Sequence, residues 1–262
     1  MSEAVSDPAA EALTSETIEL LRARVSVRKY QDRPVGDDLV EAILKAAFRA
    51  PTSSNIQSYS VVVVRDADTL RQLSVISGNQ AHIVEAPVFL AFCADLTRIE
   101  FALRKNGHDI DDNNLEIGLV SSIDAALVGM SADLAADSLG LKTVMIGAIR
   151  NDAAATARIL GLPPRVYCVY GMCLGWPAEA PRQKPRMAYD SMVHYEQYGE
   201  QRGAADLAAT VDTYDAALAR HYPSIGKPTT PDSWSHDMDV KFHPQLRDNL
   251  RTELRERGFD FR

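Results

Sequence analysis

The order of hydrophobic and polar positions predicts a chain that alternates between helices and strands. After Pro34, the apolar residues Leu39, Ile43 and Ala47 recur four apart, which is the spacing of one helical face. Short apolar runs rich in β-branched residues predict strands instead. We expect helices at residues 16–24, from an N-cap at Asp37, at 67–76, 114–139, from Asn151 or Asp152, at 205–221 and at 245–257. We expect strands at residues 58–65, 86–95, 142–147 and 165–176.

The longest predicted helix, residues 114–139, is apolar nearly all round. Between Ile117 and Ala132 its sole charge is Asp124. A helix of this kind is buried, so we expect it at the centre of the fold or in a subunit interface. Gly118 and Gly129, with several alanines, would let neighbouring elements approach closely.

The texture of the chain changes after Pro177. Residues 180–200 look extended and polar, and a Pro-rich passage, YPSIGKPTTPDSW, follows the helix at 205–221. This region lacks enough strands for a core of its own. We therefore predict a flexible tail at residues 1–15 and one domain at 16–262, which includes a C-terminal arm from about residue 180.

Composition and charge narrow the class of protein. The formal net charge is -8 and the pI is near 5.3, which argues against a general nucleic-acid binder. We see no secretory signal and no apolar stretch of the roughly 18 residues that a membrane span needs, so we expect a cytoplasmic protein with no membrane partner. The three cysteines lie in apolar runs, which predicts buried, reduced thiols.

Several common catalytic signatures are absent from the sequence. It contains no GxGxxG after a strand, no GxxxxGK[ST], no HExxH and no GxSxG. The six histidines are too scattered to suggest a metal site. Chemistry in this protein is therefore expected to belong to a bound cofactor.

Four short segments remain as candidates for binding a cofactor. The first of them is a local cluster of cations in an otherwise acidic chain. They are R-x-S-x-R at 24–28, A-P-T-S-S-N at 50–55, I-G-A at 146–148 and K-P-R at 184–186. Each alone has an ordinary explanation, since arginines near a helix end are usually solvated and PTSSN is a common loop. Together, in order and spacing, they resemble the FMN-binding segments of the nitroreductase family, in the branch of oxygen-insensitive NAD(P)H nitroreductases and flavin reductases. YGMCLGWP followed by KPRM strengthens the resemblance, which spans roughly residues 16–257.

The resemblance implies a fold and an activity. The fold is α+β, with a central, mostly antiparallel sheet flanked by helices in an intertwined homodimer that binds two FMN molecules. The activity is a ping-pong transfer of two electrons from NADPH or NADH, through FMN, to a nitroaromatic or a quinone. A free flavin as acceptor is one alternative, which would make the protein a flavin reductase. A non-catalytic sensor or store of flavin nucleotide is another.

The resemblance also assigns roles to residues. It implies that Arg24, Lys184 and Arg186 hold the FMN phosphate, with the hydroxyl of Ser26. Arg28 faces the pyrimidine edge of the flavin ring, where a fixed cation stabilises the reduced anion, and Gln80 binds the same edge. The N–H groups of Gly147 and Ala148 approach N5 and O4. A second subunit supplies the loop of Thr52, Ser53 and Ser54.

Four positions depart from the family pattern. Val25 stands where relatives often carry a second basic residue, and Ala148 stands where close relatives have glycine, so its methyl group would narrow the approach to N5. Lys227 is the sole cation where NADPH-preferring relatives place several arginines, which leaves the choice between NADPH and NADH open. His243 stands where relatives put an arginine that faces the substrate, and its role is also open.

Overall fold

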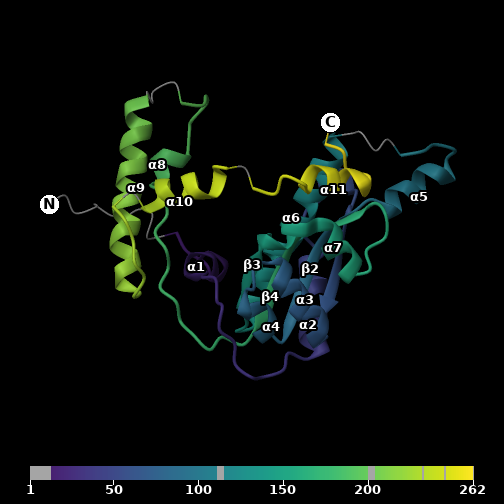
Figure 1. The fold of residues 1–262 in the computed structure, drawn as a ribbon, viewed down its shortest axis with the longest axis horizontal. Helices are drawn as coiled ribbons and strands as arrows, with labels where there is room; N and C mark the ends of the chain where they lie inside the picture. Colours follow the sequence, from purple (N-terminus) through teal and green to yellow (C-terminus); the bar gives the residue numbers. More distant parts are fainter. Residues whose placement is uncertain (1–12, 111–114, 200–203, 232, 245, 262) are drawn as a thin grey trace. The chain divides into compact units, whose positions relative to one another are not determined.

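The chain forms two compact units in the computed structural model, which describes residues 13–110, 115–199, 204–231, 233–244 and 246–261 (Figure 1). Unit 1 comprises residues 1–181 and 249–262, and unit 2 comprises residues 182–248. Unit 2 begins close to residue 180, where the sequence predicts the start of the arm. Most of the predicted tail, residues 1–12, lies outside the described residues.

Unit 1 is built on a four-stranded sheet in the order β1-β2-β4-β3, in which every neighbouring pair is antiparallel. The strands are β1 (Tyr59–Val64), β2 (Val88–Asp95), β3 (Lys142–Ile146) and β4 (Val166–Gly175). The helices are α1 (Glu16–Ala23), α2 (Asp37–Ala47), α3 (Ala67–Ile76), α4 (Ala81–Glu85), α5 (Thr97–Lys105), α6 (Leu115–Ser138), α7 (Ala153–Ile159) and α11 (Leu250–Glu256), with 3-10 turns η1 (Ser53–Asn55) and η2 (Gly147–Asp152).

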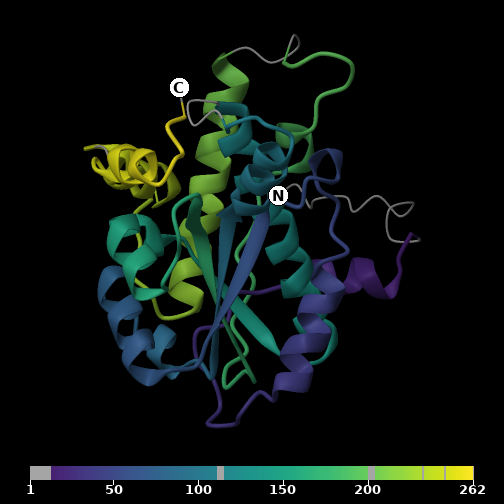
Figure 2. The same ribbon diagram turned by 90° about the vertical axis from the view of Figure 1, so that its right-hand side faces the viewer.

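Helices cover both faces of this sheet because its central strands are buried on both sides (Figure 2). In β2, Leu90 and Phe92 pack with α2 and α6 on one face. Phe89 and Ala91 point to the other face and pack with α3, α4 and η2. This confirms the predicted α+β fold with an antiparallel sheet flanked by helices.

The central helix is α6, as its sequence pattern predicts. Nine of its residues are buried, and they include two carboxylates, Asp124 and Asp133. By length and composition alone α6 is long and apolar enough to cross a membrane, so the expectation that no stretch meets that measure was wrong. Its buried side packs with α2, β2 and β4 as the core helix of unit 1.

A close approach between α6 and β4 explains the glycine at position 129. The Tyr170 hydroxyl donates to the carbonyl of Ala125, 3.2 Å away. A Cβ on Gly129 would lie 1.6 Å from that hydroxyl oxygen, so a side chain there requires the ring or the helix to move. The sequence-based reading of Gly129 as a contact point is confirmed.

We therefore expect Gly129→Ala to destabilise the fold by about 1–3 kcal/mol, the usual range for overpacking a core. Urea unfolding followed by circular dichroism measures this loss. Tyr170→Phe removes the clashing oxygen, so the double variant should lose less than the sum of the two single variants. Strict additivity of the two losses would contradict the packing explanation.

The described residues of unit 2 form the helices α8 (Tyr189–Met192), α9 (Ala204–Ser224) and α10 (Ser233–Phe242). Asp215 of α9 accepts hydrogen bonds from the main-chain N–H groups of Trp234 and Ser235, at 2.6 and 2.9 Å. Asp215 thereby supplies the capping acceptor for α10, a helix that the sequence pattern did not predict. Between residues 180 and 199, α8 is the helix that the structure describes; the residues before it have no regular secondary structure and residues 195–199 form bends, so the extended conformation expected here stays a prediction.

Three further details differ from the sequence-based expectation. Helices α4 and α5 were not predicted, and α11 begins at Leu250 rather than near 245. The N-cap of α2 is Gly36. Asp37 lies in the first helical turn, where its negative charge interacts favourably with the helix dipole and stabilises the helix. The three cysteines are free and buried, which confirms that prediction.

Residues 249–262 return to unit 1 after unit 2. Leu254 and Phe259 are buried in a third hydrophobic cluster with Tyr167 of β4. The Phe259 and Tyr167 rings meet edge to face, with centroids 4.7 Å apart. Helix α11 and the residues that follow it therefore complete the hydrophobic core at the end of the sheet where β4 begins.

Candidate functional site

The segment from Arg24 to Arg28 follows α1 in an extended conformation beside β3. Val27 is buried, and its N–H donates to the carbonyl of Thr143, 3.0 Å away. Alternation along the extended segment then leaves the Arg28 side chain exposed. The main-chain N–H of Arg28 donates to the carboxylate of Glu179, at 2.7 Å. The segment is therefore fixed on the sheet while Arg28 stays accessible.

Arg24 is held from behind by an acidic residue of α6. Its Nε donates to Oδ2 of Asp133, at 2.5 Å, and the hydroxyl of Thr143 donates to Oδ1 of the same carboxylate. Asp133 is 3% exposed. A charge-assisted contact with a buried carboxylate fixes the direction of the half-buried guanidinium. Val25 and Ser26, the other predicted residues of this segment, are also half-buried.

The second stretch that contains a predicted residue is 77–82, which includes Gln80, and the charge of Arg28 acts on its His82. Gln80 precedes α4, and its amide donates to the carbonyl of Ser77, at 2.9 Å. Burial lowers the pKa of His82, and the positive charge of Arg28 lowers it further. The imidazole is therefore neutral at neutral pH.

Two buried polar atoms in this segment lack a hydrogen-bond partner. They are Oγ of Ser77 and Nε2 of His82, and with Nε2 of His221 they form the full set among the described residues. Buried polar groups without partners are rare and commonly mark a place where a ligand or water binds. His82 was not predicted, although it lies two residues after the predicted Gln80.

The third segment, Gly147 and Ala148, begins η2 directly after β3. The amide of Asn151 in η2 donates to the carbonyl of Ile76 at the end of α3, which leads to Gln80. A Cβ on Gly147 would meet only the Arg150 guanidinium at an ordinary 3.6 Å, so packing within the chain does not require glycine. The Ala148 methyl packs against the hydrophobic cluster of that face.

The structure thus brings three of the predicted segments together in unit 1. Residues 24–28 pair with β3, β3 leads into Gly147 and Ala148, and η2 contacts the end of α3 beside Gln80. The Arg28 charge acts on His82 of the same region. The three segments are therefore linked to one another through β3, η2 and the end of α3.

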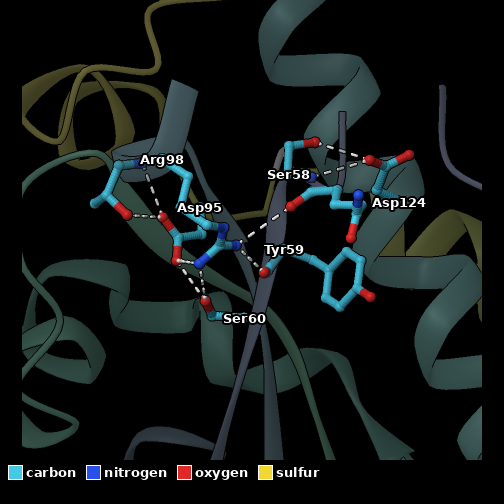
Figure 3. A network of polar contacts seen from close by, with 8 residues as sticks. Ser58, Tyr59, Ser60, Asp95, Arg98 and Asp124 are labelled. Carbon is cyan, nitrogen blue, oxygen red and sulfur yellow. Dashed lines mark hydrogen bonds and ion pairs between the residues drawn. The ribbon is translucent and has the colours of Figure 1, made fainter. Parts of the chain in front are cut away.

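The loop containing Thr52, Ser53 and Ser54 is held at both ends by one carboxylate, that of Asp124. Asp124 of α6 accepts from the N–H of Ser53 at 3.1 Å. It also accepts from the N–H and the hydroxyl of Ser58, at 3.2 and 2.9 Å (Figure 3). Ser54, Asn55 and Gln57 have positive φ angles between 47° and 58°. Such backbone needs support from its surroundings.

Arg98 of α5 adds a second support at the same loop. Its guanidinium donates to the carbonyls of Gln57 and Tyr59, and it pairs with Asp95 at 3.2 Å (Figure 3). Burial alone would raise the pKa of Asp95, but hydrogen bonds from Ser60 and Thr97 and the charge of Arg98 outweigh burial and lower it. Asp95 therefore stays ionised and keeps Arg98 in place.

Within one chain this loop lies at the opposite end of the sheet from Arg28. Tyr59, which follows the loop, pairs with Ala94 near the start of β4, whereas Tyr30 forms a bridge with Pro177 just beyond the end of β4. The ten residues of β4 span about 30 Å. The structure therefore does not bring Thr52, Ser53 and Ser54 to the other predicted residues of the same chain.

In unit 2, Lys184 and Arg186 are exposed. The Lys184 ammonium lies 3.3 Å from the Tyr222 hydroxyl and 5.1 Å from the centre of its ring. Arg186 donates to the carbonyl of Lys184, which keeps the two cations adjacent. Lys184 also lines a cavity of about 450 Å³ together with Lys227 and His236, so Lys227 is not the lone cation there. His243 is exposed in the same unit.

Another cavity, of about 530 Å³, lies in unit 1 against α5 and α11, and none of the predicted residues lines it. The sequence analysis also missed the acidic residues that hold the predicted segments, namely Asp133 and Glu179. Asp124 was noticed only as a charge in an apolar helix. Their partners lie far along the chain, so spacing carries no signal for these contacts.

Comparisons with known proteins cover nearly the whole chain. The model of the nitroreductase family matches residues 21–176, and that of the nitroreductase family, C-terminal domain, matches residues 184–262. An FMN reductase (NADPH) from Bacillus subtilis is 32% identical over 94% of this chain and 99% of its own length. An oxygen-insensitive NADPH nitroreductase from Salmonella typhimurium is 38% identical over 84% of this chain and 88% of its own length.

A solved structure agrees with these sequence matches. The NfrA1 nitroreductase from Bacillus subtilis superposes with a TM-score of 0.89 at 31% identity, covering 94% of this chain and 100% of the other. The similarity therefore extends over both units of the chain.

Proposed function

The chain belongs to the nitroreductase family, and from this premise we propose that it is an FMN-dependent NAD(P)H oxidoreductase that reduces nitroaromatics, quinones or a second flavin. NADPH is named for both relatives described above, and NADH remains the alternative donor. The protein is cytoplasmic in this proposal, and it needs neither a nucleic acid nor a membrane.

The residues present fit an FMN molecule. A mononucleotide has an anionic phosphate and a ring edge that accepts hydrogen bonds, and it therefore needs cations and N–H donors. In support of this fit, the segment that carries Arg24 and Arg28 is bonded to β3, and β3 leads directly into the first amides of η2. The buried Nε2 of His82 has no hydrogen-bond partner among the residues that the structure describes. The glycine at 147, which packing does not require, suits close approach by a ligand.

We assign roles to the residues as follows. Arg24, Ser26, Lys184 and Arg186 hold the phosphate, and Val25 lines the same segment. Arg28 and Gln80 face the pyrimidine edge of the ring, and the N–H groups of Gly147 and Ala148 face its N5 side. Thr52, Ser53 and Ser54 come from a second subunit.

Bound FMN would supply the redox chemistry, because flavin accepts a hydride and passes on two electrons. The chain itself binds and orients the cofactor, and the fixed charge of Arg28 stabilises negative charge at the ring edge. Donor and acceptor would use one pocket in turn, which gives ping-pong kinetics.

A homodimer is part of this proposal, and α6 supports it. Leu119, Ile123 and Leu127 form an exposed apolar row four residues apart on a helix whose other side is the core, with Ile123 55% exposed. Apolar rows of this kind are usually covered by a partner. The loop held by Asp124 lies against the same helix. A second copy on this face would bring its loop to a flavin site that one chain cannot complete.

The observation that carries the proposal is the anchored segment 24–28, in which Asp133 fixes Arg24 while Arg28 stays exposed. The test is anaerobic titration of the purified, FMN-loaded protein with NADPH or NADH. We expect the oxidised flavin spectrum to bleach with one equivalent of donor. Colourless protein that does not take up FMN, or bound flavin that neither donor bleaches, would overturn the proposal, and the second result would favour a flavin store.

Flavin reductase activity is the second candidate, favoured by the relative named FMN reductase. Steady-state rates with a nitrofuran, a quinone and free FMN would rank the acceptors. A rate with free FMN that exceeds the other two would assign the protein to flavin reduction.

Arg186→Ala is expected to weaken FMN binding about 10- to 100-fold, because one charge-assisted contact to the phosphate contributes about 1.5–3 kcal/mol. Flavin content after gel filtration and titration of the stripped protein with FMN measure the loss. Arg182→Ala, an exposed arginine four residues earlier, is the matched control and should retain its flavin. Full flavin content in Arg186→Ala would remove this residue from the phosphate site.

A further inference from the structure

Helix α6 carries two buried carboxylates on its core side, and each holds one of the predicted flavin-binding segments. Asp124 is 0% exposed and Asp133 is 3% exposed. Burying a carboxylate is unfavourable unless it receives hydrogen bonds or a cation. Both receive them from segments far away in sequence, so these contacts organise the chain rather than the helix alone.

Asp133 acts on the segment that carries the phosphate-binding arginine. It accepts from Arg24 Nε on one oxygen and from the Thr143 hydroxyl on the other. The carbonyl of Thr143 in turn accepts from the N–H of Val27. Thr143 therefore links the carboxylate to the backbone of the segment, and Asp133 fixes both the position and the direction of Arg24.

Asp124 acts on the loop of Thr52, Ser53 and Ser54. Its two oxygens accept three hydrogen bonds from Ser53 and Ser58, which lie on either side of residues with positive φ. Both ends of this strained turn are therefore tied to α6. Without the carboxylate, two buried or half-buried main-chain donors would lose their acceptor.

The two carboxylates stand nine residues apart (133 minus 124) on α6, which is about 13 Å along the helix axis. The two carboxylates therefore hold their groups at different points along α6, which agrees with action on two different flavins. The opposite positions of the loop and Arg28 on the sheet lead to the same conclusion.

We propose that Asp124 and Asp133 are positioning residues that act on two different flavins: Asp133 orients Arg24 for the site of its own subunit, and Asp124 shapes the loop for the site of the partner. This inference rests on the proposed function, because it takes the homodimer and the FMN sites as given. It assigns different roles to two residues of α6, and neither the predicted site residues nor the family matches include these roles.

The inference is tested with full-length protein stripped of FMN and titrated with FMN, with quenching of flavin fluorescence as the readout. Asp133→Asn and Asp124→Asn keep the size of the side chain but remove its charge. Each homodimer is expected to bind FMN at least tenfold more weakly than wild type at both sites. Asp137→Asn, on the same helix but paired with Lys142, is the matched control and should bind like wild type.

The decisive sample is a mixed dimer with Asp133→Asn in one subunit and Asp124→Asn in the other, isolated with two affinity tags. One site then receives both changes, and the other receives neither. We expect one site of wild-type affinity per dimer and one that is weaker than in either homodimer. If the substitutions acted only by disturbing the fold of their own subunits, no site of the mixed dimer would regain wild-type affinity. A site of wild-type affinity would also show that both subunits are folded.

Three results would overturn the inference, and they are distinguishable. Wild-type affinity in both single variants would remove the carboxylates from flavin binding and leave the proposed function intact. Weak binding at both sites of the mixed dimer would refute the division between subunits. Absence of FMN binding by wild-type protein would refute the proposed function itself. If an asparagine variant does not fold, Thr143→Val and Ser58→Ala replace the pair, with a smaller loss expected in the same pattern.

Discussion

Replacing Arg28 with alanine is expected to slow reduction of the bound flavin by NADPH about a hundredfold, which corresponds to roughly 3 kcal/mol. Arg28 is exposed on a segment whose backbone is anchored to β3 and to Glu179, so its charge is held in place before the reaction begins. A fixed cation stabilises charge without reorganisation. Anaerobic stopped-flow absorbance at saturating FMN measures the effect separately from cofactor loss.

A second readout tests the placement of Arg28 without any cofactor. The Arg28 charge lowers the pKa of His82, so Arg28→Ala should raise that pKa, which an NMR titration of the imidazole can follow. Lys29→Ala is the matched control, since it removes an adjacent exposed cation. An unchanged rate of reduction in FMN-saturated Arg28→Ala would show that its role is wrong.

Ile123→Glu is expected to separate the proposed dimer and to abolish tight FMN binding at the same time. Ile123 is the most exposed residue of the apolar row on α6, and by symmetry the substitution places two carboxylates in one interface. Burying unpaired charges costs several kcal/mol, so the dimer dissociation constant should rise at least about a thousandfold, or roughly 4 kcal/mol. Sedimentation velocity measures the association state.

Val75→Glu is the control for this prediction. Val75 is 66% exposed on α3, which covers the opposite face of the sheet. We expect that variant to behave like wild type in both association and flavin content. A stable dimer with full flavin in Ile123→Glu would place the interface elsewhere.

The sequence predicted elements well where the hydrophobic pattern was long and uninterrupted. The apolar stretch of α6 and the buried run of β4 needed no information beyond their own residues. Helices α5 and α10 were not predicted, for two different reasons. Helix α5 buries none of its residues, so burial imposed no apolar pattern on it. Helix α10 receives its capping acceptor from Asp215, which lies 19 residues before Trp234.

The candidate site shows the same limit. Arg24 and Arg28 were recognised because they form a compact motif. The structure links their segment to those of Gly147 and Gln80 through β3, η2 and the end of α3, while the roles of these residues stay predictions. Asp133 contacts Arg24 across 109 positions, and Asp124 contacts Ser53 across 71. Such contacts arise only when the sheet brings α6 beneath these segments, so no local spacing encodes them.

The return of residues 249–262 to unit 1 has a consequence for synthesis in the cell. Tyr167 emerges from the ribosome long before Leu254 and Phe259, the side chains that cover it. All of unit 2 must therefore be synthesised while the hydrophobic cluster around Tyr167 in unit 1 is still incomplete. A stop codon within unit 2 would leave that apolar surface uncovered, and we expect such fragments to be captured by chaperones rather than to accumulate as folded protein.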